Sequence, residues 1–187
     1  GSLPLLEASR LKGWAAMRNA TLTTIAPTGT ISIIAGTSSG IEPLFALAYV
    51  RNVLEGAHLT EVSPLFQRAA EKRGIWSPQL QAELARKGSA SSLEGVPEEM
   101  KDLFVTALEI PPEQHVRVQA AFQKYTDNAV SKTVNLAEKA TVEDVLRVYN
   151  LAYDSGCKGV TVFRYGSRSQ VLYLGNGETV PGCKYCG

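Results

Sequence analysis

A run of hydroxyl-bearing residues around a Pro-Thr-Gly turn is the feature of this sequence best suited to chemistry. Residues 22–26 suit a buried strand, the turn follows at residues 27–29, and a short apolar stretch with further hydroxyls comes next. A strand that turns into a helix start directs free backbone N–H groups and the positive end of the helix dipole at an anion. The candidate phosphate-binding site consists of Pro27, Thr28, Gly29, Thr30, Ile31 and Ser32.

The charges around this turn indicate how it would hold a phosphate. No lysine or arginine occurs between Arg18 and Arg51, so dipoles and hydroxyl groups would bind the anion instead of a point charge. Gly29 suits a close approach of the backbone, because a Cβ atom there would crowd the phosphate. Glu42 would repel a phosphate and is interpreted as structural. The alternative is an ordinary turn whose hydroxyls only cap a helix.

The second chemical feature is a pair of cysteines, Cys183 and Cys186, in a C-x-x-C motif that follows a Gly- and Pro-rich stretch. Such a pair is redox-active in some proteins and half of a zinc site in others. Three interpretations stay open: a redox shuttle on a tail, half of a zinc site, or an inert pair. Cys157, at a predicted helix end, is interpreted as a small packed residue.

No metal site is predicted elsewhere. His58 and His115 have no second histidine, cysteine or acid at metal-ligand spacing, so each is interpreted as a surface or capped histidine. Arg164 and Arg168 follow the last predicted strand, where they would either face a ligand or pair with nearby acids.

Composition excludes several classes of protein. The 187 residues are 44% hydrophobic, which is enough for the core of one domain of ordinary size. A net charge of +1 gives no general attraction to a nucleic acid polymer or a membrane surface. The longest uncharged stretch, residues 19–41, is broken by Thr, Ser, Gly and Pro, so no membrane span is expected. Three cysteines do not make a secreted disulfide framework, so a cytoplasmic location is expected.

Helices and strands alternate along the predicted chain. Ser-Pro pairs, a capping box and terminal glycines mark the helix ends. Helices are predicted over residues 3–17, 63–74, 77–87, 97–107 and 141–155, with a longer one from residue 111, and strands over residues 22–26, 44–53, 131–136 and 159–163. Residues 88–96 are interpreted as a polar linker.

This order indicates an α/β chain, because parallel neighbouring strands need long crossover connections. The strands are too few for a complete structure, so the chain is expected to be a helix-rich part of a larger sheet or barrel. Residues 1–174 are expected to form that part, and residues 175–187 a flexible tail that carries the C-x-x-C motif.

Three separate blocks resemble the adenosylcobalamin-dependent (class II) ribonucleotide reductases, in the order in which that family has them. The blocks are residues 19–43 (NATLTTIAPTGTISIIAGTSSGIEP), residues 127–135 (DNAVSKTVN) with 140–145 (ATVEDV), and residues 156–168 (GCKGVTVFRYGSR). The resemblance runs from about Arg18 to Leu172 and corresponds to the C-terminal part of the family's catalytic chain.

This resemblance implies a fold and an activity. The fold is a ten-stranded α/β barrel with a central finger loop, whose cysteine becomes a thiyl radical and takes a hydrogen from C3′ of a ribonucleotide. The implied cofactor is adenosylcobalamin, and the implied partners are the remaining N-terminal part of the catalytic chain and a thioredoxin-type reductant. The resemblance also places the substrate phosphates at residues 27–31 and makes Cys183 and Cys186 a redox tail.

One family feature is missing from the sequence. The finger-loop pattern Asn-x-Cys-x-Glu does not occur, so no catalytic residue is assigned in this chain. The chain is therefore expected to be a partial piece of a ribonucleoside-diphosphate reductase that contributes a substrate subsite and is inactive alone. The alternative is a stand-alone nucleotide- or phosphate-binding module, or an assembly module, without catalysis.

Overall fold

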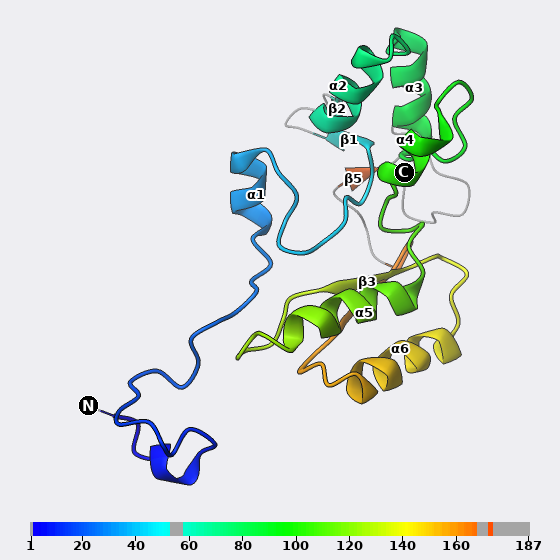
Figure 1. Cartoon of the computed structure of the whole chain (residues 1–187). Helices are drawn as coiled ribbons and strands as arrows, with labels where there is room; N and C mark the ends of the chain where they lie inside the picture. The colour runs from blue at the N-terminus through cyan, green and yellow to red at the C-terminus, as the bar shows by residue number, and fades with distance from the viewer. Residues whose placement is uncertain (1, 53–57, 168–171, 174–187) are drawn as a thin grey trace.

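The computed structural model describes residues 2–52, 58–167 and 172–173, which form two lobes and an N-terminal arm (Figure 1). One lobe contains the β1–β2 hairpin with α2, α3 and α4, and the other contains β3 and β4 with α5 and α6. Residues 2–20 form an arm that extends away from both lobes. The predicted tail, residues 175–187, lies outside the described residues.

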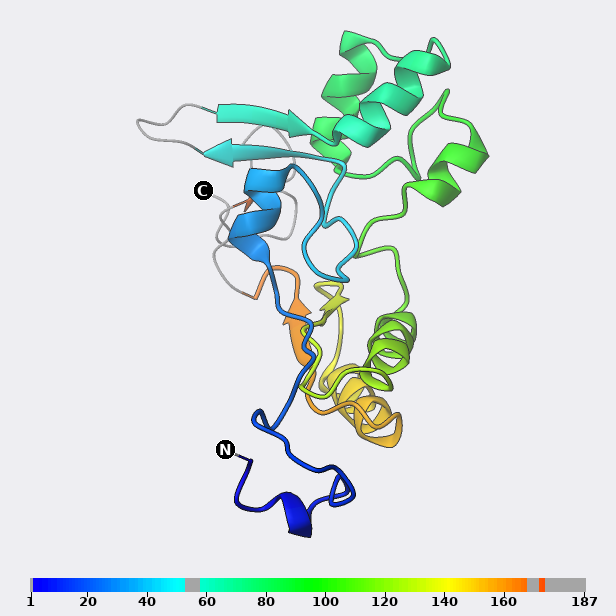
Figure 2. The same ribbon diagram turned by 60° about the vertical axis from the view of Figure 1, so that its left-hand side comes forward.

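The first lobe is built on an antiparallel hairpin. β1 (Ala48–Asn52) pairs with β2 (His58–Val62) in the register Ala48↔Val62, and β5 (Leu172–Tyr173) lies on the other side of β1. Figure 2 shows the hairpin reaching away from α2 and α3 toward the side on which α1 lies. The core of this lobe contains large apolar side chains that are almost fully buried, among them Phe66, Leu84, Leu93 and Met100.

Local sequence signals explain the helices of the first lobe. Both α2 (Pro64–Lys72) and α3 (Pro78–Lys87) begin with proline, whose missing N–H group costs nothing in the first turn of a helix. The Ser77 hydroxyl accepts a hydrogen bond from Leu80 N, and Gly88 ends α3 in the left-handed conformation. α4 (Glu98–Leu103) is shorter than the predicted helix over residues 97–107.

The second lobe is a parallel β-α-β unit. β3 (Thr133–Leu136) and β4 (Thr161–Arg164) are parallel neighbours, and α6 (Val142–Asp154) forms the crossover between them. The predicted capping box at the start of α6 is confirmed, with reciprocal hydrogen bonds between Thr141 and Asp144. α5 (Pro112–Gln123) packs beside α6, and the shared core contains Val116, Val134, Leu136, Val148 and Ala152.

Residues 22–26 run alongside the start of β3. Ile25 forms an isolated parallel bridge with Val130, and Ser131 N donates to Ile25 O at 2.9 Å. The Asp127 carboxylate accepts hydrogen bonds from Leu22 N and Thr23 N, and the first of these bonds is the main reason that the pKa of Asp127 is lowered. The predicted strand is therefore too long: the segment follows the direction of a third parallel strand, but only Ile25 pairs in the manner of a strand.

Two other expectations from the sequence were wrong. The helix predicted over residues 3–17 is only a short 3-10 turn, η1 (Leu6–Ala8), because the arm packs mainly on itself and leaves residues such as Trp14 exposed. The stretch of residues 88–96 is not the polar linker that was predicted, since its residues Ala90, Leu93 and Val96 are buried in the core of the first lobe. The strand β2 was not anticipated at all.

Within the described residues, no helix combines the length and the apolar character that crossing a membrane requires.

Candidate functional site

The candidate site begins at a strained residue that starts a short helix. α1 (Gly29–Ala35) starts directly after the Pro27–Thr28 step. Thr28 has a φ of 53°, in the left-handed region that a β-branched residue rarely adopts. This conformation turns the chain sharply, so that α1 leaves the direction of residues 22–26 at once.

The first backbone N–H groups of this helix have no acceptor among the residues that the structure describes. The first helical hydrogen bond runs from Ser32 N to Thr28 O at 2.9 Å. Within the described part of the chain, no hydrogen bond uses the N–H group of Thr28, Gly29, Thr30 or Ile31. Such unpaired donors at the positive end of a helix dipole are the usual elements of an anion-binding turn.

The hydroxyl groups of the turn have different roles. Thr28 Oγ1 does not cap α1, because it accepts a hydrogen bond from Gly40 N at 2.7 Å. Ser32 is buried, and its Oγ donates to Gly29 O at 2.7 Å, which braces the first turn of the helix. Thr30 is exposed. Of the three hydroxyls singled out in the sequence, two therefore also hold the turn in shape.

Gly29 leaves open space in front of the helix start. A Cβ atom built on Gly29 would meet no other atom of the described residues within 4 Å, so these residues do not require glycine at this position. Gly40 is different: its φ is 49°, and a Cβ atom there would lie 3.1 Å from Ala26 O. The fold therefore explains why residue 40 is glycine. A requirement for glycine at residue 29 would have to come from a group outside the described residues.

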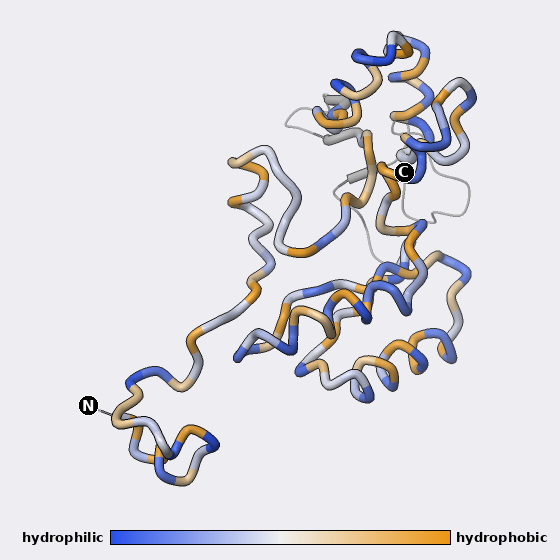
Figure 3. Tube along the Cα trace, viewed as in Figure 1, coloured by the Kyte–Doolittle hydropathy of each residue, from blue (hydrophilic) through white to orange (hydrophobic). Residues whose placement is uncertain are grey.

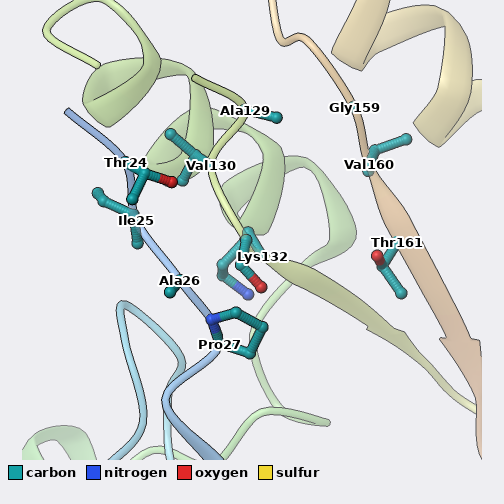
Figure 4. A pocket seen from close by; sticks show the side chains of 11 residues that line it. Thr24, Ile25, Ala26, Pro27, Ala129, Val130, Lys132, Gly159, Val160 and Thr161 are labelled. Atoms are coloured by element: carbon teal, nitrogen blue, oxygen red, sulfur yellow. The ribbon is translucent and has the colours of Figure 1, made fainter. Parts of the chain in front are cut away.

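An open hollow of about 490 Å³ begins at Pro27 (Figure 4). Its walls are residues 24–27, 129–132 and 159–161, which are the neighbouring segments of the parallel sheet. Lys132 is the one charged residue among the described residues that line it. The positive charge of the Lys132 ammonium is not available to balance the charge of a ligand in this hollow, since the ammonium is already bound to protein groups.

Lys132 belongs to a polar cluster that the sequence did not reveal. Its Nζ lies 2.7 Å from Glu42 Oε2 and 2.8 Å from His115 Nδ1, and it also donates to Thr133 O. Burial and then the nearby Lys132 ammonium hold the pKa of the His115 imidazole below its usual range. Glu42 is structural, as expected. Of the two interpretations of His115, a surface or a capped histidine, the surface one is wrong, because the side chain is almost fully buried and both ring nitrogens are hydrogen-bonded.

No sequence spacing could have predicted this cluster, because Glu42, His115 and Lys132 come from three distant segments. The only available signal was a lysine inside the β-prone stretch of residues 131–136, where a charged side chain needs a partner.

The described residues offer no metal centre. They contain no group of three or more histidine, cysteine or acidic side chains that could hold a metal ion. Cys157 is half-buried and packs against the second core, as the sequence suggested, and burial raises the pKa of its thiol. Cys183, Cys186 and the side chain of His58 lie outside the described part of the chain.

Comparison with known proteins identifies the family. The family described as "Ribonucleotide reductase, barrel domain" matches residues 9–163. The chain belongs to this ribonucleotide reductase family. The chain is 54% identical over 164 residues to the vitamin B12-dependent ribonucleoside-diphosphate reductase of Thermoplasma acidophilum, and 49% identical over 173 residues to that of Mycobacterium tuberculosis.

These alignments cover most of the chain but little of the relatives. They include 87% and 92% of this chain, whereas the chain spans only 21% and 25% of the two reductases. The Actinobacillus ureae class Id ribonucleotide reductase alpha subunit has a similar structure, with a TM-score of 0.67 and 26% sequence identity. The match covers 82% of this chain and 28% of the alpha subunit. The α/β fold class, a partial ribonucleotide reductase barrel, is thereby confirmed, and no closed barrel forms among the described residues.

The close approach of Gly40 to Ala26 O can be tested in the complete protein, with Gly36, another left-handed glycine after α1, as the control. Alanine at Gly36 (φ 64°) or Gly40 should cost about 1–2 kcal/mol for the left-handed backbone. Only Gly40→Ala should add a clash with Ala26 O, so it should open the turn more than the matched control Gly36→Ala. Hydrogen exchange of the Ser32 and Thr37 amides measures this opening; equal acceleration in both variants would show that the contact is unimportant.

Proposed function

We propose that the complete protein containing this chain is a ribonucleotide reductase, which converts ribonucleotides to 2′-deoxyribonucleotides by thiyl-radical chemistry. The chain contributes the substrate phosphate-binding turn, and the radical cysteine lies outside it. The observation that carries this assignment is the set of unpaired N–H groups from Thr28 to Ile31, at a helix start in a member of the reductase family. Since the related reductases are named for ribonucleoside diphosphates, we assign a diphosphate as the substrate.

The turn of residues 27–32 would bind a phosphate in three ways. Its free N–H groups donate hydrogen bonds to the anionic oxygens, and a hydrogen bond to a charged acceptor is worth about 1.5–3 kcal/mol. The positive end of the α1 dipole attracts the charge. The hydroxyl protons of Thr28 and Thr30 add donors, because Thr28 Oγ1 uses only its acceptor capacity on Gly40. Ser32 and Pro27 fix the shape of the turn.

We assign adenosylcobalamin as the cofactor of the complete protein, because the related reductases are named as vitamin B12-dependent. The described residues do not themselves fit this group. Imidazole is the commonest protein ligand for a metal, and His115 is buried with both ring nitrogens already hydrogen-bonded. The described side chains therefore supply no free imidazole for its cobalt, and the group would be held by other parts of the complete protein.

The remaining assignments concern partners and location. The remaining part of the catalytic chain would supply the Asn-x-Cys-x-Glu loop, which this sequence lacks. A thioredoxin-type reductant would deliver electrons through Cys183 and Cys186, and the protein would act in the cytoplasm.

Because this sequence lacks the Asn-x-Cys-x-Glu loop, a second candidate function is a phosphate-binding or assembly module without catalysis. The complete reading frame distinguishes the two, because only a reductase must encode the loop.

The role of Gly29 can be tested by Gly29→Ala in the complete reductase. The methyl group meets no protein atom within 4 Å, so the fold should be retained, but it would crowd a phosphate at the helix start. Loss of one hydrogen bond to the anion should raise the KM for a ribonucleoside diphosphate about tenfold. Gly13→Ala, which also enters open space, is the matched control. An unchanged KM in a folded Gly29→Ala protein would remove the phosphate assignment.

The role of the C-x-x-C pair can be tested by replacing both Cys183 and Cys186 with serine in the complete reductase. A redox tail predicts loss of turnover with a thioredoxin-type reductant. The family resemblance implies a disulfide that forms in the active site during turnover, and a buried disulfide needs a thiolate delivered by a tethered segment. Turnover with a small dithiol should survive. Cys157→Ser is the control. Equal loss with both reductants, or stoichiometric zinc on these sulfurs, would identify the pair as structural.

A further inference from the structure

Lys132 is a buried cation whose three donors are all used. Its side chain is 1% exposed, and its Nζ binds Glu42 Oε2 at 2.7 Å, His115 Nδ1 at 2.8 Å and Thr133 O at 2.5 Å. An ammonium group has three N–H donors. No donor is left for a ligand in the hollow beside it, so the charge acts inside the protein.

Glu42 accepts hydrogen bonds on both carboxylate oxygens. Oε2 binds the Lys132 ammonium, and Oε1 accepts from Thr133 N at 2.6 Å, at the first residue of β3. The loop after α1 is thus fixed to the parallel sheet by two bonds that span about ninety residues of sequence. Breaking one partner of such a pair leaves a buried charge uncompensated and is strongly unfavourable.

His115 extends the cluster to the first lobe. Because Nδ1 accepts from the Lys132 ammonium, the neutral ring carries its proton on Nε2, which donates to Ala107 O at 3.0 Å. Ala107 N in turn donates to Leu44 O at 2.9 Å, two residues after Glu42. The segment around Glu42 is therefore fixed from both sides.

The fixed segment reaches the phosphate turn through Gly40. Gly40 N donates to Thr28 Oγ1 at 2.7 Å, and Gly40 precedes Glu42 by two residues. Thr28 is the strained residue that starts α1. α1 has little packing of its own, because Ile31, Ile33 and Ile34 are exposed. Figure 3 shows that this helix carries hydrophobic residues. A helix of this length is not stable by itself.

We propose that Glu42 and Lys132 are positioning residues, whose buried ion pair holds the loop that fixes Thr28 and so aims the free N–H groups of α1 at the substrate phosphates. This role depends on the proposed phosphate site. Neither side chain touches the substrate: Lys132 has no free donor, and Glu42 acts through Gly40 and Thr28. A cationic side chain would be a stronger phosphate ligand than a dipole, yet Lys132, which lines the hollow beside the turn, holds the loop instead.

The test uses Glu42→Gln in the complete reductase, with two readouts. Hydrogen exchange of peptides covering residues 36–43 reports whether the loop is released. Inhibition by inorganic pyrophosphate, which competes for the phosphate site, reports whether the turn still binds an anion. We expect faster exchange and an inhibition constant raised about tenfold, with the KM for a ribonucleoside diphosphate raised in parallel. The kcat per folded protein should stay within about twofold, because the reacting groups lie elsewhere.

Two further variants keep the test interpretable. Glu99→Gln removes an exposed carboxylate that is paired with Arg73 at 3.1 Å, and it should change neither readout. The double variant Glu42→Gln with Lys132→Met removes the unpaired ammonium, so it should fold even if Glu42→Gln does not. It should still show faster exchange and weaker inhibition, because the loop is not held.

Three results would overturn the positioning role: wild-type exchange and inhibition in folded Glu42→Gln, a fall in kcat with unchanged KM and inhibition, or recovery of wild-type inhibition in the double variant. Failure of pyrophosphate to compete in the wild-type reductase would instead overturn the phosphate site itself.

Discussion

The geometry of the candidate site depends on the hydrogen bonds at the ends of α1, because this helix of 7 residues buries only Ser32. Apolar packing, the main source of helix stability in proteins, is almost absent here. The Thr28–Gly40 bond and the buried contacts of Glu42 replace it. They tie the turn to the parallel sheet of the second lobe. These bonds do not use the N–H groups of residues 28–31, which have no acceptor within the described part of the chain.

This arrangement separates two electrostatic tasks. A point charge is used inside the protein, where the Lys132 ammonium meets a carboxylate and an imidazole away from water. Dipoles would do the binding at the proposed site, where a substrate phosphate would have to bind and later leave. The open space in front of Gly29 is consistent with this division. The family match includes the residues of this turn, and this chain spans only 21% of the related reductase of Thermoplasma acidophilum.

Local signals in the sequence predicted the elements that depend on local chemistry. The starts of α2, α3 and α6 follow from Ser-Pro pairs and a capping box, and all three were predicted close to their observed positions. Features that depend on distant residues could not be predicted: the arm lacks a core to stabilise its expected helix, and β2 is set by pairing with β1. The position of the turn was predictable from its glycine and hydroxyls, but the Glu42–Lys132–His115 cluster was not, because three-dimensional proximity alone creates it.

The most direct measurement is a structure of the complete reductase with a bound ribonucleoside diphosphate. We predict phosphate oxygens within about 2.7–3.2 Å of the backbone nitrogens of Gly29, Thr30 and Ile31, with Lys132 still paired to Glu42. A diphosphate held by lysine or arginine side chains at another place, with the N–H groups of this turn facing only water, would contradict the account.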